Sequence, residues 1–328
     1  MAPRQAFMTD QELLAMFLDK VSAEYPKHMF HFFADRAARG ILLPFTKGLL
    51  RVVGFVESPS PGYASEMLRR IAAIQGIGES QYEALLAILA EIYVTGGLLE
   101  QADHQAGKPL FAHEPGPKGK KNPEFEVCVA GHWVAIEVKT PGLIQHRRLR
   151  STNSYQAGVR LPKEVVASMN PMRPKDSPVK KFLVSAEEKF AVYEAHRNGA
   201  FRLLVIVWDD SCNEPIAALT SPVAGLLTEQ SFYQDNDDNP VRYPHIDGVI
   251  VIRYQHQIIR ATQCRPLIDG ATEPLLYRHE GFPPKAFIEV PGGRSVPDTL
   301  LEALNATPLS ACLGAEYQPL EMIKWMDG

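Results

Sequence analysis

The sequence has few of the features that would indicate a disulfide scaffold, a zinc site or a membrane protein. Its 328 residues include only four cysteines, none in Cys-x-x-Cys spacing (Cys128, Cys212, Cys264 and Cys312), so neither a disulfide framework nor a zinc finger is expected. No unbroken apolar run approaches the ~18–20 residues that span a membrane, and no charged segment followed by an apolar one opens the chain. These absences predict a cytoplasmic globular protein that does not enter a membrane.

The sequence also lacks the short motifs of several large enzyme classes. It has no phosphate-binding glycine loop, no HExxH and no GxSxG, which argues against an NTPase, a zinc metalloprotease and a serine hydrolase. Any process driven by ATP would therefore need a motor or recognition subunit on another chain. The net charge of −4 gives no overall basic excess, but residues 118–189 carry 14 Lys and Arg against 7 Asp and Glu. Such a local excess is typical of a phosphate-binding surface.

Residues 122–141 are the most informative segment, because their pattern predicts a β-hairpin with a charged face. Side chains alternate between the two faces of a strand. In residues 133–139, apolar side chains therefore share one face, and Glu137 and Lys139 share the other. A two-residue turn at Ala130-Gly131 would set Glu124 opposite Glu137. Cross-strand neighbours lie about 4.5–5.5 Å apart at Cβ, where two like charges are destabilising unless a cation lies between them.

The pair Pro123-Glu124, followed by Glu137-Val138-Lys139, resembles the signature of the PD-(D/E)xK, or restriction-endonuclease-like, nuclease superfamily. The resemblance implies an α/β (α+β) fold with an α-β-β-β-α-β core and a mixed central sheet. It also implies a Mg²⁺ or Mn²⁺ site with Glu124, Glu137 and the backbone carbonyl of Val138 as ligands. Hard divalent ions prefer such oxygen ligands. Lys139 would orient the attacking water or stabilise charge on the phosphate.

The sequence departs from that signature in one place, and it offers two further acidic candidates. Glu124 stands where Asp is more usual, which adds one methylene to the side chain. Glu126 lies on the same predicted face and is the alternative metal ligand. A helix expected to begin at Ser80 and end at Gly96-Gly97 carries Glu91 at the edge of its apolar stripe. Members of the superfamily often place an acidic residue on such a helix, facing the metal.

The rest of the chain supplies elements that suit this core. We expect a strand at 109–112, a helix that opens at Asp176-Ser177-Pro178, a buried strand at 201–208 and another strand at 248–253. Residues 1–79 are expected to form a helical N-terminal region, 80–255 the nuclease-like core, and 256–328 an extension packed on it. In that extension we expect a strand at 286–290 and a helix near 297–305.

Basic residues on both sides of the hairpin are candidates for contact with nucleic acid. They are Lys120, Lys121, Arg147, Arg148, Arg150 and, with them, the polar Gln156. Residues 142–176 show no long regular element apart from a short helix near 163–169, and we interpret them as an arm that contacts DNA. A homodimer would allow cleavage of both strands.

Two functions from different classes follow from these patterns. The first is a metal-dependent nuclease that hydrolyses phosphodiester bonds, in DNA rather than RNA. Restriction, phage defence, repair and mobile-element processing all suit it. The second is a protein that keeps the nuclease fold without catalysis and binds nucleic acid or a protein partner.

Overall fold

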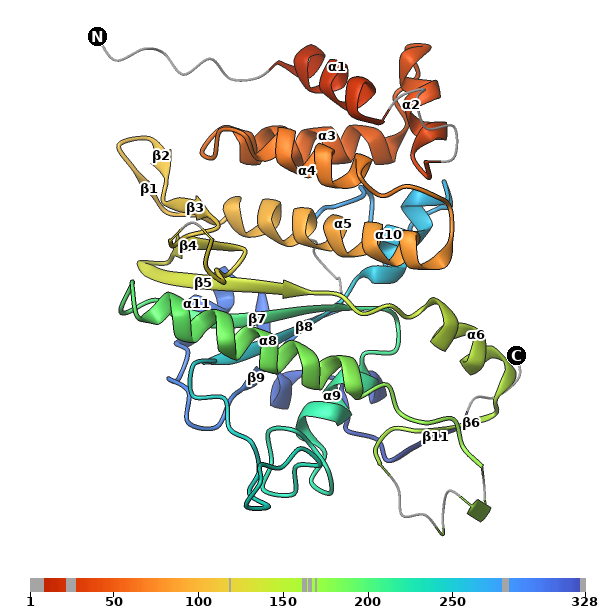
Figure 1. The fold of residues 1–328 in the computed structure, drawn as a ribbon, viewed down its shortest axis with the longest axis vertical. Helices are drawn as coiled ribbons and strands as arrows, with labels where there is room; N and C mark the ends of the chain where they lie inside the picture. The colour runs from red at the N-terminus through yellow and green to blue at the C-terminus, as the bar shows by residue number, and fades with distance from the viewer. Residues whose placement is uncertain are drawn as a thin grey trace.

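A seven-stranded mixed sheet forms the centre of the molecule, with helices on both faces (Figure 1). The computed structural model describes residues 9–21, 28–117, 119–160, 164, 167–168, 170–278 and 283–324. The strand order is β10-β9-β8-β7-β5-β4-β3. Strands β5, β7 and β8 run parallel to one another, and β10 runs parallel to β9. The pairs β3–β4, β4–β5 and β8–β9 are antiparallel. The expectation of an α/β protein with a mixed central sheet is thus confirmed.

The strands of this sheet are short at the edges and longer in the centre. They are β3 (Phe111–His113), β4 (Phe125–Val129), β5 (His132–Lys139), β7 (Phe201–Trp208), β8 (Gly248–Arg253), β9 (Lys285–Glu289) and β10 (Ala306–Pro308). Two small pairs lie outside it, β1 (His104–Gln105) with β2 (Lys108–Pro109), and β6 (Tyr155–Ala157) with β11 (Met322–Lys324). The apolar run of β7 is buried along nearly its whole length, as the sequence predicted for a central strand.

The hairpin of β4 and β5 has the predicted turn and register. Ala130 and Gly131 have φ angles of 51° and 78°, and positive φ at both central residues is the requirement of a type I′ turn. Phe125 pairs with Ile136, and the Glu124 amide donates to the Ile136 carbonyl at 2.9 Å. The register therefore brings Glu124 beside Glu137.

The N-terminal helices and the long helix α5 cover one face of the sheet (Figure 1). They are α1 (Asp10–Val21), α2 (His31–Ala38), α3 (Pro44–Glu57), α4 (Tyr63–Ala72) and α5 (Glu79–Leu99), joined by α10 (Gln255–Thr262) and α11 (Asp298–Ala303). The first four helices share one apolar core with the sheet. The described residues of the region 1–79 therefore pack against the sheet instead of forming a separate unit.

Helix α5 differs from its prediction at both ends. The Ser80–Glu83 capping box does not form, because the helix begins at Glu79 and the Glu83 carboxylate instead accepts from the Ile144 amide at 3.0 Å. Gly96 and Gly97 do not end the helix, which continues to Leu99. A Cβ at Gly97 would overlap the Tyr277 ring, so glycine is needed there for close packing rather than for a helix stop.

Helices α8 (Ser177–Glu194) and α9 (Asn213–Thr220) cover the other face of the sheet, where α8 packs beside β5 and β7 (Figure 1). Helix α6 (Ile144–Thr152) lies beyond the end of β5 and was not predicted. The short helix expected near 163–169 falls largely outside the described residues. Beyond residue 255, β9 and β10 extend the central sheet, so the C-terminal region is part of the sheet rather than an addition to it.

Helix α5 is also long and apolar enough to cross a membrane, by length and composition alone. In the described part of the chain it is the one helix that passes this test, and 78% of its apolar window is buried inside the protein. The sequence analysis had expected no such segment. The burial is that of a core helix, which satisfies the same criterion as a membrane span.

Candidate active site

Glu124 and Glu137 converge on one ammonium group, that of Lys189. The Lys189 Nζ lies 3.2 Å from Glu124 Oε1 and 2.8 Å from Glu137 Oε1. Glu124 immediately precedes β4, Glu137 lies on β5 with no solvent exposure, and Lys189 lies on α8. Two facing carboxylates are destabilising without a cation, and here the helix that packs on the carboxylate face of the hairpin supplies it.

Lys139 lies on the other side of Glu137. Its Nζ is 2.5 Å from Glu137 Oε1, and about a fifth of its side chain is exposed. The buried carboxylate is therefore held between two lysines, one from its own strand and one from α8. Lys139 and Lys189 both reach solvent, so they are the parts of the site that can meet an anionic ligand.

The electrostatics of the site centre on Glu124. Burial raises the pKa of this carboxyl from 4.5 to about 7, and the negative charges of Glu91 and Glu137 act in the same direction against Lys189 and Lys139. Burial lowers the pKa of Lys189, but Glu137 and Glu124 outweigh it and raise that pKa above its ordinary value. Near neutral pH, Glu124 can thus gain or lose a proton while Lys189 stays charged.

Glu91 faces inward, as the sequence allowed, but it has its own cation. Both of its oxygens accept from Arg70 of α4 at 2.7 Å, and His113 Nε2 lies 3.9 Å away. Burial raises the pKa of Glu91, whereas His113 and Arg70 lower it by a larger amount. Glu91 acts on the site through its charge, which raises the pKa of Glu124.

Glu126, the alternative ligand, is committed to a different set of partners. It is buried opposite Ala135, accepts from the Tyr193 hydroxyl at 2.6 Å and pairs with Arg197 at 2.5 Å. The structure therefore brings Glu124, and not Glu126, beside Glu137. The side chain of Val138 packs in the apolar core, so only its backbone carbonyl could contribute to a site.

Lys189 is the site residue that the sequence analysis missed. The helix was predicted correctly, but the lysine was not assigned to the site because its partners lie more than 50 residues earlier. Lys189, Tyr193 and Arg197 are spaced four apart and contact the hairpin carboxylates in turn. This spacing, adjacent to the apolar face of the helix, is the signal that could have found it.

A pocket of about 600 Å³ opens beside Glu124 and Lys189. Lys120 and Lys121 line it together with His113 and Asn122. Lys120 is exposed, and Lys121 pairs with Glu188 of α8. Two of the basic residues chosen from the sequence thus lie at the mouth of the carboxylate site, where they would attract a phosphate.

Of the four candidate residues in and after α6, Arg147 and Arg148 reach solvent, whereas Arg150 and Gln156 are buried. Arg147 is partly exposed with its Nε 3.9 Å from Asp209, and Arg148 is exposed and pairs with Glu79. Arg150 is buried against Asp209, and Gln156 is buried against Glu214. These last two side chains do not reach the surface, so they position the segment after β5 instead of contacting a ligand.

The donor chemistry of the site fits a hard divalent ion only in part. Among the described residues, no three His, Cys, Asp or Glu side chains converge closely enough to hold a metal. Mg²⁺ needs only one or two carboxylates when water and substrate phosphate complete its shell, and Glu124 and Glu137 supply these. Glu137 Oε1 accepts no well-aligned hydrogen bond although two ammonium groups lie close to it. Lys189 occupies the position between the carboxylates that a bridging cation would take.

Comparisons of this chain with protein-family models, with curated proteins and with solved structures find no match.

Proposed function

We propose that the protein is a metal-dependent nuclease that hydrolyses phosphodiester bonds, in DNA rather than RNA. We also propose that its fold is of the restriction-endonuclease-like type. The observation that carries the proposal is the convergence of Glu124 and Glu137 on Lys189, with Lys139 alongside. The buried Glu137 lies between two lysines and shares one of them with the partly buried Glu124, beside a lysine-lined pocket. This arrangement suits phosphate chemistry better than structural stabilisation.

Each residue would have a distinct task. Glu124 and Glu137 would hold Mg²⁺ or Mn²⁺, which polarises a phosphate and activates a water when it is bound. Lys139 would stabilise the negative charge that develops on the phosphate oxygens. Lys120 and Lys121 would hold the neighbouring phosphates of the strand at the mouth of the pocket. Lys189 would keep the two carboxylates together before the metal enters.

A second function is favoured by one specific observation. Lys189 already pairs with both carboxylates, and Lys139 supplies a second positive charge beside Glu137, as a site without metal would require. In that case the same surface binds nucleic acid and does not cleave it. We place either activity in the cytoplasm, with DNA as the partner and with homodimer formation as the means of cutting both strands.

Cleavage and binding measured on the same DNA separate the two functions. Linear, circular and single-stranded DNA would be incubated with Mg²⁺ or Mn²⁺, and binding would be measured in EDTA. A nuclease cleaves at least one substrate, loses cleavage in EDTA and loses it in Lys139→Ala. Binding without cleavage of any substrate, under both metals, would assign the protein to the binding class. The exposed Lys181 of α8 gives a matched control, Lys181→Ala, which should cleave like the wild type.

A further inference from the structure

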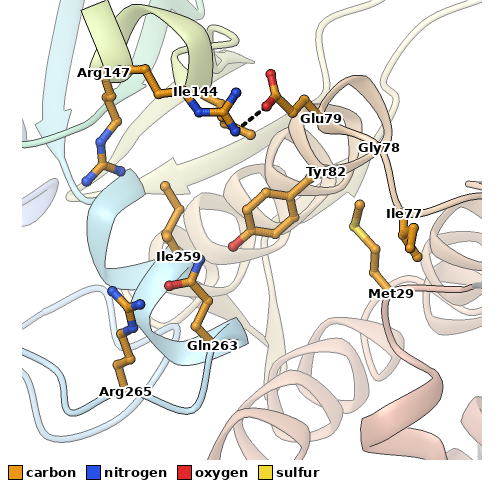
Figure 2. Close-up of a pocket in the computed structure, with 11 residues that line it drawn as sticks. Met29, Ile77, Gly78, Glu79, Tyr82, Ile144, Arg147, Ile259, Gln263 and Arg265 are labelled. Atoms are coloured by element: carbon orange, nitrogen blue, oxygen red, sulfur yellow. Dashed lines mark ion pairs between the residues drawn. The ribbon is translucent and has the colours of Figure 1, made fainter. Parts of the chain in front are cut away.

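A second pocket, of about 500 Å³, lies between α6, the first turn of α5 and the end of α10 (Figure 2). It is separate from the lysine-lined pocket and shares none of its lining residues. Its volume falls within the range of ~300–1,000 Å³ usual for small-molecule sites. Ile144, which lines it, follows Lys139 by five residues, so their Cα atoms are at most ~18 Å apart.

The polar wall of this pocket carries two guanidinium groups. Arg147 and Arg265 lie on the same side of the pocket, with Ile259 and Gln263 between them (Figure 2). Among the described residues Arg265 has no ion pair, and the one carboxylate within 4 Å of the Arg147 guanidinium is that of Asp209, at 3.9 Å. Two guanidinium groups with little carboxylate neutralisation on one wall favour an anion, and their planar forks suit a phosphate.

Arg148 and Glu79 also line the pocket and pair with each other, and the other walls are aromatic and apolar. The Tyr82 ring projects into the pocket, its hydroxyl bonded to Thr262 at 2.6 Å, and Met29 and Ile77 lie on the side away from the arginines (Figure 2). Burial raises the pKa of Tyr82, and the positive charges of Arg147 and Arg265 act against it, which agrees with both arginines facing the ring. An aromatic ring beside apolar side chains accepts a flat heterocycle by stacking.

We infer that this pocket binds a nucleoside phosphate, with the phosphate at Arg147 and Arg265 and the base against Tyr82. The side-chain amide of Gln263 offers two N–H donors and one carbonyl acceptor, which can form hydrogen bonds with the edge of a base. Inorganic phosphate would leave the apolar wall unused, and a purely apolar ligand would leave two guanidinium groups desolvated. The same chemistry belongs to the end of a nucleic acid strand and to a free nucleotide. The inference does not depend on cleavage, because it concerns binding alone.

Calorimetric titration in EDTA tests the inference, because EDTA prevents any metal-dependent cleavage. The probes are the four nucleoside 5′-monophosphates, with inorganic phosphate and adenosine as comparators. At least one monophosphate should bind the full-length protein more tightly than either comparator. Arg265→Gln should weaken that binding about tenfold or more. Tyr82→Leu should also weaken it, whereas Tyr82→Phe, which keeps the ring, should bind like the wild type.

Arg242→Gln is the matched control, because Arg242 is an exposed arginine paired with Glu229 and lies outside the pocket. A linear DNA oligonucleotide with a 5′-phosphate that displaces the monophosphate would identify a strand end as the ligand. A monophosphate that binds without being displaced would identify the free nucleotide. No binding of any monophosphate at millimolar concentration, or unchanged binding in both Arg265→Gln and Tyr82→Leu, would overturn the inference.

Discussion

The ammonium group of Lys189 contacts both oxygens of the buried Glu137 carboxylate, at 2.8 and 2.9 Å. This contact joins helix α8 to strand β5 at the one place in the hairpin where two carboxylates meet. Removal of one member of a buried ion pair leaves the other charge without compensation. Lys189 is therefore expected to stabilise the fold and, at the same time, to compete with any metal for the same oxygens.

Replacement of Lys189 by methionine tests both roles. We expect Lys189→Met to lower the free energy of unfolding at pH 8 by about 1–3 kcal/mol, whereas Lys181→Met on the same helix should change it by less than about 0.5 kcal/mol. Mg²⁺ should raise the melting temperature of Lys189→Met more than that of the wild type, because the freed carboxylates bind it without a competitor. Equal losses of stability in Lys189→Met and Lys181→Met would contradict the structural role of Lys189. An equal rise of the melting temperature with Mg²⁺ in Lys189→Met and in wild type would contradict its competition with the metal.

The pH dependence of stability tests the environment of Glu124. Its pKa is raised from 4.5 to about 7 by burial and by Glu91 and Glu137, so between these pH values the folded state binds more protons than the unfolded state. The stability that this proton provides is complete below about pH 4.5 and is lost as the pH rises through 7. We expect wild type to lose on the order of 2 kcal/mol relative to Glu124→Gln between pH 5 and 8. Chemical denaturation at several pH values measures the free energy of unfolding of both proteins. Free energies that change in parallel with pH would show that the pKa of Glu124 is not raised.

Lys285 gives a pH effect in the opposite direction. It is buried over the Tyr277 ring, and burial, aided by Arg278, lowers its pKa from 10.5 to about 7. The unfolded chain then binds more protons between pH 7 and 10.5, so the wild type gains stability as the pH rises through this range. Lys285→Met should be more stable than wild type by about 2 kcal/mol at pH 7, with an advantage that shrinks toward pH 10. A stability difference between Lys285→Met and wild type that does not change with pH would contradict the lowered pKa of Lys285.

Close packing at α5 predicts a contrast between two helical glycines. Gly97→Ala places a methyl group against the Tyr277 ring and should destabilise the protein by about 2–4 kcal/mol. Gly54→Ala meets only the tip of the flexible Leu13 side chain, and the better helix propensity of alanine offsets much of that cost. Its melting temperature should stay close to that of the wild type. A similar loss in both variants would show that the space at Gly97 is not limiting.

Local pattern was sufficient to predict the hairpin and the main strands. The register of Phe125 with Ile136 follows from a two-residue turn and from alternation, both of which act within 20 residues. The strand at Phe201–Trp208 was predicted because its apolar run is interrupted only by Arg202. For the same reason Glu124 and Glu137 could be paired from the sequence alone.

The parts that the sequence analysis missed depend on contacts between distant segments. Helix α6 has almost no apolar stripe, so its pattern gave no helix signal. Arg150 and Gln156 were taken for surface residues, but Asp209 and Glu214, about 60 residues later, hold them in the interior. Lys189 was overlooked for the same reason. Charged side chains carry no periodic signal for burial, and their partners become known only from the fold.

The proposed role of Glu137 in metal-dependent cleavage is decided by the initial rate of Mg²⁺-dependent cleavage of DNA by wild type and by Glu137→Gln. Glutamine keeps the size of the side chain and removes the charge that holds the lysines and the metal. We expect a loss of about 100-fold or more, with unchanged DNA binding in EDTA and an unaffected Glu289→Gln control at an exposed position on β9. Full cleavage by Glu137→Gln, or wild-type cleavage that persists in EDTA, would contradict the proposed site.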